Sequence, residues 1–373
     1  MGFDVPILFL VFNRPDLTAK VFSVLRQLRP RRLFVAADGP RTNVDGEAAL
    51  CGQTREIATA IDWECEVKTL FRNKNHGCGP AVSGAISWFF DQVEEGVILE
   101  DDCLPSLSFF DFCKYALEEF REDTRIGTVS GDYFLPPDLF LDQPYYFSKY
   151  FQIWGWATWQ RVWQKYRLDL SFETEENWLS IFRENHSAPL EADYWIEILR
   201  ALVKETLNTW DYQMMFISWR ERLLHVAPTR NLVSNIGYRL DATHTCFESP
   251  LANFPRQEIK DFEVDLEVRA NSQIDNLTFY VRFLESLRST WWLRLALTRD
   301  GVRNGVPDFS GHFQDLAAQV LRLEHSHQRI ERALQHLVES NQRIDNAQQS
   351  LYLFNKLFSP IFALQRWLAN RKH

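Results

Sequence analysis

The sequence lacks the features that mark several common classes of protein. Its six cysteines form no CxxC pair and no framework spacing, so we expect free thiols of a reducing compartment. No run approaches the roughly 20 apolar residues that a membrane-spanning helix needs. Acidic residues also outnumber basic ones, 50 to 41. The formal net charge of −9 argues against nucleic acid as a partner, because phosphate binding needs a basic face.

Two nucleotide-binding signatures and an export signal are missing as well. No GxGxxG follows the first predicted strand, and no GxxxxGK followed by Ser or Thr occurs in the chain. This argues against a dinucleotide-binding fold and against a P-loop. The chain enters an apolar strand at once, without a basic n-region and a cleavable apolar segment. We therefore expect a cytoplasmic protein.

Aromatic side chains are abundant instead. The 13 Trp and 29 Phe suit stacking on sugar rings as well as core packing. The rest of the composition, 46% hydrophobic and 24% charged, is ordinary for a soluble globular protein. A chain of 373 residues is long enough for one large α/β domain with appendages, or for two medium domains.

Three consecutive acids, Glu100, Asp101 and Asp102, follow a short apolar run at 96–99. The run predicts a buried strand of a parallel sheet, and ligands of open α/β sheets bind beyond the carboxyl ends of such strands. Carboxylates packed together repel one another, and a hard divalent cation with hydroxyl groups relieves that repulsion. The alternative is a solvated acidic turn in which Asp102 caps a helix that begins near Pro105.

Further apolar runs alternate with helical patterns along the first 130 residues. Strands are predicted at 5–12, 33–37, 67–71, 96–99 and 126–130. Helices are predicted to begin at Pro15, near Pro80 and near Pro105. This alternation predicts the α/β class, with a mostly parallel, Rossmann-like sheet that has helices on both faces.

Polar residues follow three of these strands, and the carboxyl ends of parallel strands meet at one edge of a sheet. Asn13 and Arg14 follow the first strand, Asp38 the second, and the acid triplet the fourth. A carboxylate can accept from a uracil N–H, an arginine can clamp phosphate, and acids can hold a metal on a diphosphate. The group indicates a nucleotide site, although Asp38 alone is equally compatible with a turn and Arg14 alone with a surface cation.

Aromatic residues dominate the chain beyond position 145. Trp156, Trp159 and Trp163 fall at helical spacing and predict a helix that is partly core. Trp154 and Gly155 precede it and are expected in a loop that lines the pocket.

Two later residues are candidates for chemistry. Asp211 stands between Trp210 and Tyr212, surroundings that can hold the pKa of a carboxyl near a working value. His244 is a candidate last metal ligand, with a structural histidine as the alternative.

Together these motifs resemble the nucleotide-diphospho-sugar transferases of the GT-A fold. The likeness is greatest to relatives of the Golgi alpha-1,3-mannosyl-glycoprotein 2-beta-N-acetylglucosaminyltransferase and covers about residues 5–247. Segments 231–237 and 242–245 are similar to the end of the catalytic domain in bacterial chains. The loop at 72–79 is more similar to the Asn-x-x-Asn-x-Gly of family 2 glycosyltransferases, which leaves the donor sugar open. The motifs that carry the resemblance are Phe12-Asn13-Arg14, Ala37-Asp38-Gly39, Val97-Ile98-Leu99-Glu100-Asp101-Asp102, Gly155-Trp156 and Trp210-Asp211.

The resemblance implies a UDP-sugar donor, GlcNAc-like, a manganese or magnesium ion, and inversion at the anomeric carbon. It implies that Asp102 binds the metal, that Asp38 meets the uracil and that Asp211 is the catalytic base. His244 is the further metal ligand that we expect, and the acceptor is expected to be a glycan or glycolipid. The predicted nucleotide-sugar-binding residues are Phe12, Asn13, Arg14, Asp38, Arg72, Gly77, Glu100, Asp101, Trp154 and Gly155.

The C-terminal third is predicted to serve assembly. Beyond a catalytic domain at 1–250, we expect a linker with packing helices at 251–311, a coiled coil at 312–351 and a basic amphipathic tail at 352–373. Five heptads run through the coiled-coil segment, and Asn341 at an a position with leucine-rich d positions favours a parallel dimer. A long helix lying on the catalytic domain is the alternative. The tail is typical of an interfacial membrane helix at the inner face of the membrane, with a dimer end-cap as the alternative.

Three other functions stay open at this point. A nucleotidyltransferase would share the fold but normally carries a Gly-rich phosphate loop with a basic residue after the first strand, and Asn13-Arg14-Pro15-Asp16 is not one. A glycoside hydrolase would use two of the acids without nucleotide or metal. A catalytically inactive chain would use the fold only to present the coiled coil.

Overall fold

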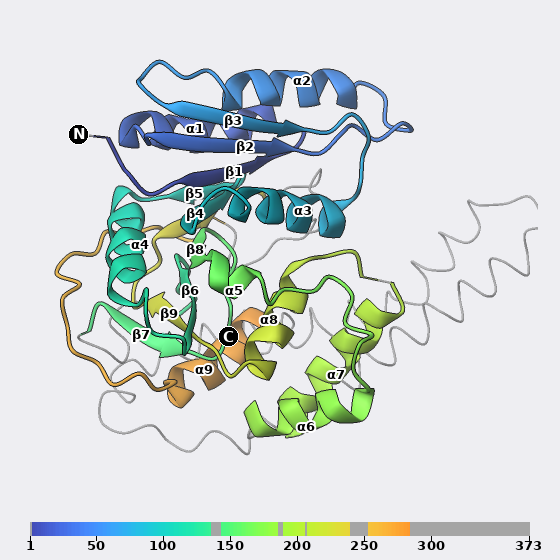
Figure 1. Ribbon diagram of the computed structural model, residues 1–373, viewed down its shortest axis with the longest axis vertical. Helices are drawn as coiled ribbons and strands as arrows, with labels where there is room; N and C mark the ends of the chain where they lie inside the picture. Colours follow the sequence, from blue (N-terminus) through green and yellow to red (C-terminus); the bar gives the residue numbers. More distant parts are fainter. Residues whose placement is uncertain (1, 136–142, 186–188, 206, 239–252, 284–373) are drawn as a thin grey trace, which may run out of the picture. The chain divides into compact units, whose positions relative to one another are not determined.

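The computed structural model describes residues 2–135, 143–185, 189–205, 207–238 and 253–283 (Figure 1). The chain divides into two compact units, Met1–Gln314 and Asp315–His373, and every described residue belongs to the first. His244, the predicted coiled coil at 312–351 and the predicted tail at 352–373 lie outside the described residues. Within the described ranges, no helix is long and apolar enough to cross a membrane.

The five strands and three helices predicted for the first 130 residues are present, whereas the helix Glu47–Ala58, the short strand Cys103–Pro105 and most elements beyond residue 130 were not predicted. The strands are β1 (Ile7–Val11), β2 (Arg32–Ala37), β3 (Glu66–Phe71), β4 (Glu95–Glu100), β5 (Cys103–Pro105), β6 (Ile126–Ser130), β7 (Tyr145–Ser148), β8 (Trp156–Trp159), β9 (Leu224–Pro228) and β10 (Val233–Asn235). The helices are α1 (Pro15–Leu28), α2 (Glu47–Ala58), α3 (Cys78–Phe90), α4 (Leu107–Glu119), α5 (Gln160–Trp163), α6 (Glu175–Asn185), α7 (Pro189–Val203), α8 (Asp211–Arg220), α9 (Ser272–Thr278) and the π-helical turn η1 (Phe279–Phe283).

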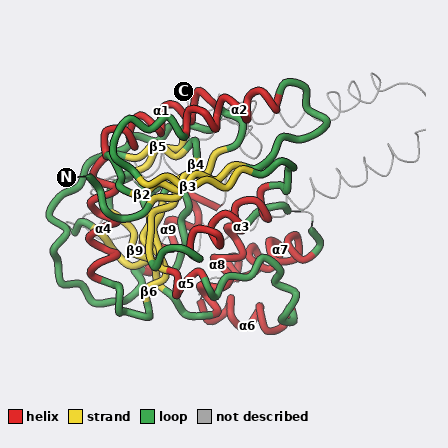
Figure 2. Tube along the Cα trace, turned by 45° about the horizontal axis from the view of Figure 1, so that its top comes forward, coloured by secondary structure: helices red, strands yellow, loops and turns green. Residues whose placement is uncertain are grey.

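Eight of the strands form one sheet in the order β3-β2-β1-β4-β8-β6-β9-β7. β1 to β4 are parallel neighbours, and β6 runs in their direction because both β4 and β6 are antiparallel to β8, which lies between them. Figure 2 shows α1 and α2 on one side of these strands and α3 on the other. The predicted α/β class, a large Rossmann-like sheet flanked by helices, is confirmed.

The inner strands are buried because helices cover both of their faces. All five residues of β1 are buried, as are the apolar residues of β4. Pro15 opens α1, as predicted, and the helix packs Leu17, Val21 and Leu25 into the core.

The prediction of a helix over the tryptophans at 156–163 is wrong for its first half. Trp156–Trp159 is strand β8, and only Gln160–Trp163 is helical. Trp156 pairs with Ile98 of β4 and with Ser130 of β6, so hydrogen bonding on both sides of the strand overrides the helical spacing of the tryptophans. The inserted strand makes the sheet mixed rather than purely parallel.

A short second sheet brings a late part of the chain beside the acid triplet. β10 pairs with β5, which directly follows the acids. The amide of Ile236 then donates to the carbonyl of Asp102 over 2.9 Å. Gly237 lies so close that a Cβ there would be 2.1 Å from Asp102 Oδ2, so only glycine fits at this position.

The described residues after position 252 run along the outside of this unit, and we call residues 253–283 the strap. Asn253 N donates to the carbonyl of Asn235 over 2.9 Å, and Ile259 N donates to Ser108 Oγ over 3.1 Å. At the far end of the strap, α9 places buried Asp275 against β7, where the carboxylate accepts from Ser148 Oγ over 2.6 Å. The strap thus follows the unit from β10 to β7.

Candidate active site

The structure brings the predicted strand-end residues to one edge of the sheet. β1 pairs in register with both of its neighbours, so that Val11 lies opposite Ala37 and Leu10 opposite Glu100. Asn13, Asp38 and the acid triplet therefore follow the same ends of three adjacent strands, as the sequence predicts. This edge is the place where open α/β sheets bind ligands.

Arg14 is paired with two of the three acids. Its Nη1 lies 3.0 Å from Asp102 Oδ2, and its Nη2 contacts Asp101 Oδ1. The amide of Phe12 also donates to Asp101, over 3.2 Å to Oδ2. The guanidinium therefore compensates charge within the triplet, and its side chain keeps about a quarter of its surface exposed for a ligand (23%).

The acids perturb one another. Burial, reinforced by Asp102 and Asp101, raises the pKa of Glu100 to about 8. Burial also raises the pKa of Asp101 to about 6, although Arg14 opposes the shift. Two closely spaced carboxyls that resist ionisation are ready to accept a positive charge from a ligand or a cation.

Asp38 organises the loop at 72–79. Its carboxylate accepts from the amide of Gly39 over 2.9 Å, from that of His76 over 2.9 Å and from that of Gly77 over 3.1 Å. Arg72, at the start of the loop, donates to the carbonyl of Ala81 over 3.0 Å. The structure therefore shows Asp38 in the turn role that the sequence left open, and its contact with a nucleobase stays a prediction.

Asn13 is hydrogen-bonded to an acid, Glu47, that the sequence did not indicate as a site residue. Its side chain donates to Glu47 Oε1 over 2.9 Å, and Glu47 is almost fully buried at the start of α2. Arg41 closes an ion pair with the same carboxylate. The segment between β2 and α2 is thereby tied to the end of β1. A lone glutamate at the start of a helix gave no signal of this role.

Asp211 lies at the first turn of α8 and close to the triplet. Thr209 Oγ1 donates to its carboxylate, and the indole of Trp210 stacks on that of Trp156 with ring centroids 5.6 Å apart. Asn208 Oδ1 accepts from the amide of Gly79 over 2.9 Å, which ties the start of α8 to the start of α3.

The surroundings of Cys78 locate the acids relative to one another. Burial, together with the charges of Glu100, Asp211 and Asp38, raises the pKa of the Cys78 thiol to about 12. The thiol is therefore within electrostatic reach of acids from β4, α8 and the end of β2. Together with the bond between Gly79 and Asn208, this puts the start of α8, which carries Asp211, beside the start of α3 at the predicted site. Cys78 is a neighbour that the sequence did not indicate.

Trp154 lies in a loop before β8, as predicted, but its side chain is buried. The indole meets the ring of Phe134 at 5.2 Å and that of Tyr238 at 5.8 Å. Its backbone amide donates to Asp132 Oδ2 over 2.9 Å. Asp132 stands two residues after β6, at the same sheet edge, and the rule that found the acid triplet could have found it.

The acids suit a divalent cation in kind. Carboxylate oxygens are the ligands that manganese and magnesium prefer. Within the part of the chain that the structure describes, however, no three His, Cys, Asp or Glu side chains come together in a way that could hold a metal ion. A cation at Asp102 would therefore take its other ligands from a bound diphosphate, from water or from a residue such as His244 outside the described ranges.

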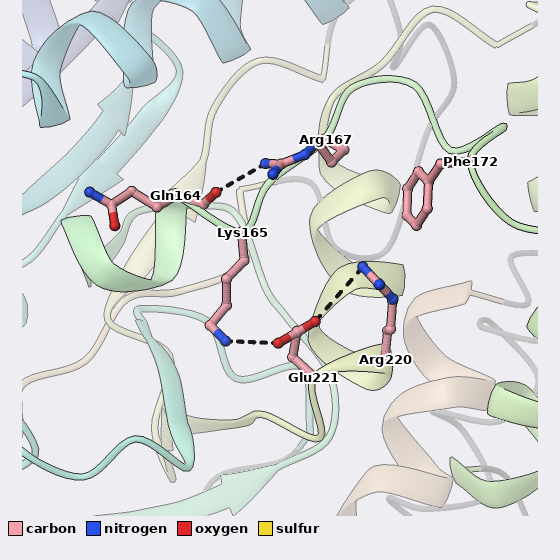
Figure 3. A pocket seen from close by; sticks show the side chains of 6 residues that line it. All are labelled: Gln164, Lys165, Arg167, Phe172, Arg220 and Glu221. Atoms are coloured by element: carbon pink, nitrogen blue, oxygen red, sulfur yellow. Dashed lines mark hydrogen bonds and ion pairs between the residues drawn. The ribbon is translucent and has the colours of Figure 1, made fainter.

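A pocket of about 450 Å³ lies away from this edge (Figure 3). Residues at the end of α8 opposite Asp211 help to line it, about 15 Å along the helix. Two of its three cations are in ion pairs, since Lys165 lies 2.7 Å from Glu221 and Arg220 lies 2.7 Å from Glu173. The third, Arg167, donates to the carbonyls of Gln164 and Tyr166. None of the predicted site residues lines this pocket, which is formed by Gln164, Lys165, Arg167, Phe172, Arg220 and Glu221.

Comparison with known proteins leaves the family of the chain open. No protein-family model and no curated protein matches it. HddC from Yersinia pseudotuberculosis aligns over 45% of this chain and 84% of its own, with 10% identity and a TM-score of 0.28. An inositol-1-phosphate CTP transferase from T. maritima aligns over 60% and 85%, with 12% identity and a TM-score of 0.31. A UDP-glucose pyrophosphorylase complexed with UDP-glucose aligns over 61% and 90%, with 9% identity and a TM-score of 0.30. Likeness at this level assigns no activity to the chain.

Proposed function

We propose that this protein is an inverting glycosyltransferase that moves a sugar from a UDP-sugar, GlcNAc-like, to a hydroxyl group of a glycan or glycolipid. The observation that carries the proposal is the convergence of the acid triplet and Arg14 at the carboxyl edge of the sheet, with Asp211 within electrostatic reach of Glu100. The raised pKa of the Cys78 thiol, which responds to Glu100 and Asp211 together, supports this proximity. The resemblance of these motifs to GT-A transferases supports it from the sequence.

The proposed reaction assigns one step to each group. Asp211 takes the proton from the acceptor hydroxyl, and the oxygen of that hydroxyl bonds to the anomeric carbon of the donor sugar. The bond from that carbon to the diphosphate oxygen breaks on the opposite face, and UDP leaves with the electron pair. Arg14, at the start of α1, lies where its guanidinium can face the departing diphosphate.

A divalent cation fits this scheme in the chemistry of its ligands. Asp102 would hold it, with His244 and the diphosphate as further ligands, and the cation would neutralise charge on the leaving group. Glu100 and Asp101 would contact the ribose and steady the cation site. The rest of the scheme depends only on residues of the chain.

The test is turnover of a panel of UDP-sugars, followed through UDP release with and without added Mn²⁺. The proposal expects release from at least one UDP-sugar, accelerated by a hydroxyl acceptor. A nucleotidyltransferase would instead make a nucleotide-sugar from a nucleoside triphosphate and a sugar phosphate. A hydrolase would cleave glycosides without nucleotide, and an inactive chain would do none of these.

A further inference from the structure

Asp132 is a buried acid with an unmet hydrogen-bonding oxygen. The residue is 1% exposed, and its Oδ2 accepts from the amide of Trp154 over 2.9 Å. Across the described part of the chain, its Oδ1 has no hydrogen-bond partner. Asp275, equally buried, has both oxygens bonded, to Ser148 and to Lys149. Leaving a buried acceptor unpaired costs about 1–3 kcal/mol, so Asp132 stands out among the buried acids.

The strap brings a cation to the same place. Arg282, in η1, places its guanidinium carbon 5.2 Å from the ring centroid of Trp154 and 5.5 Å from that of Phe134. Burial lowers the pKa of Arg282, but Tyr238, Tyr212, Asp211 and Asp132 together raise it above its ordinary value. Arg282 therefore lies within electrostatic reach of both the predicted base and Asp132.

The order of the strands sets where this group lies along the edge. Eight of the ten residues predicted to bind the nucleotide-sugar lie at or just after the ends of β1 to β4, whereas Asp132 follows β6, two strands beyond β4. Trp154, one of the other two, donates its amide to Asp132. Neighbouring strands lie about 4.8 Å apart, so Asp132 is about 10 Å past the acid triplet. Asp211 acts on the pKa of both Glu100 and Arg282, so it lies within electrostatic reach of the acid triplet and of the cation that the strap supplies. Asp132 stands at the same edge of the sheet, beyond the triplet, with its carboxylate on the amide of Trp154.

We propose that Asp132 is an acceptor-binding residue, whose Oδ1 accepts a hydrogen bond from a sugar hydroxyl neighbouring the one that Asp211 deprotonates. Arg282 and the ring of Trp154 form the wall of this acceptor subsite. The assignment rests on the proposed glycosyl transfer and adds the part of the site that selects the acceptor. It also gives the strap a role, because the strap supplies Arg282.

The experiment measures binding of a sugar probe apart from binding of the nucleotide. Isothermal titration of the full chain with UDP comes first, with and without Mn²⁺. Saturation-transfer NMR then measures binding of p-nitrophenyl hexopyranosides of gluco, galacto, manno and N-acetylgluco configuration, with UDP present. The variants are Asp132→Ala, Asp132→Asn and, as a matched control on the surface, Asp123→Ala.

The proposal expects at least one glycoside to bind the wild type, and Asp132→Ala to weaken that binding about tenfold, the loss of one hydrogen bond. UDP affinity should stay within twofold in both alanine variants, and Asp123→Ala should bind the glycoside normally. Binding of UDP but of no glycoside would overturn the acceptor subsite, as would unchanged glycoside affinity in Asp132→Ala. If the alanine variant does not fold, Asp132→Asn replaces it, because the asparagine keeps an oxygen that can accept from the amide of Trp154. A glycoside affinity of Asp132→Asn equal to that of the wild type would then contradict the proposal. Failure to bind UDP at all would instead remove the proposed function.

Discussion

At the residue scale, the account depends on Asp211 as the catalytic base. Asp211→Asn should keep UDP binding and lose at least about 10²-fold in turnover, the usual contribution of a general base. The measurement is the initial rate of UDP release with donor and acceptor saturating. Asp111→Asn, on the exposed face of α4, is the control and should leave the rate unchanged. Near-normal turnover in Asp211→Asn would mean that the base lies elsewhere.

A second residue makes stability depend on pH. Burial lowers the pKa of His225 to about 3, and its Nδ1 is 2.8 Å from Thr128 Oγ1. Between pH 6.5 and about 3, His225 is protonated in the unfolded chain and neutral in the folded chain. The free energy of unfolding therefore falls as the pH falls, by up to about 1.4 kcal/mol per pH unit. Thermal melts from pH 7 to 4.5 should show a shallower decline for His225→Gln than for the wild type. Parallel curves would show that His225 does not titrate in this way.

At the element scale, the loop at 72–79 packs against the start of α8, and Gly79 N donates to Asn208 Oδ1. Gly77 has φ 81°, and a Cβ there would be 2.7 Å from Asn208 Nδ2. Gly77→Ala should therefore destabilise the protein by about 1–3 kcal/mol and reduce turnover through Asp211. Gly52→Ala is the matched control, because Gly52 lies within α2 with open space around it. This substitution should raise the free energy of unfolding by up to about 1 kcal/mol. Urea unfolding measures both, and equal stability of the two variants would contradict the coupling.

The predicted elements of the first 130 residues could be found because their signals are local. The apolar runs of β1, β2 and β4 end in polar residues, and Pro15 marks the start of α1. Parallel pairing then puts those ends together without further information. Strand β8 could not be predicted, since its tryptophans fit a helix and only pairing with two neighbouring strands makes them a strand.

The candidate site was predictable to the same extent. The acid triplet and Asp211 follow recognisable patterns, and Asp132 follows β6 by the same rule as the triplet follows β4. Arg282 had no sequence signal at all. Its position depends on how the strap runs from β10 to β7, which is a matter of contacts between distant parts of the chain.

At the scale of the whole molecule, assembly and nucleotide binding should be separable. Removing residues from Leu316 onward should convert a dimer to a monomer, because the predicted heptads lie there. UDP binding should persist, since the predicted nucleotide site comes from earlier residues. Light scattering and UDP titration of the full and shortened chains measure this. A full chain that is monomeric at micromolar concentration would contradict the coiled coil.

A deeper truncation serves as the contrast. Removing residues from 253 onward would also delete the strap, with buried Ile274 and Asp275 and the bonds to β7 and α4. This shorter chain should melt well below the one that ends before Leu316. Equal melting temperatures would show that the strap adds nothing to the catalytic unit.

The central claim is that the acid-lined edge of the sheet binds a nucleotide diphosphate with the help of a cation. Isothermal titration of the full chain with UDP, with and without Mn²⁺, measures it most directly, with Asp102→Asn beside the wild type. The account predicts that Mn²⁺ tightens UDP binding in the wild type and that Asp102→Asn loses this enhancement without unfolding. A wild type that binds no UDP in either condition, or an Asp102→Asn variant with the full enhancement, would contradict it.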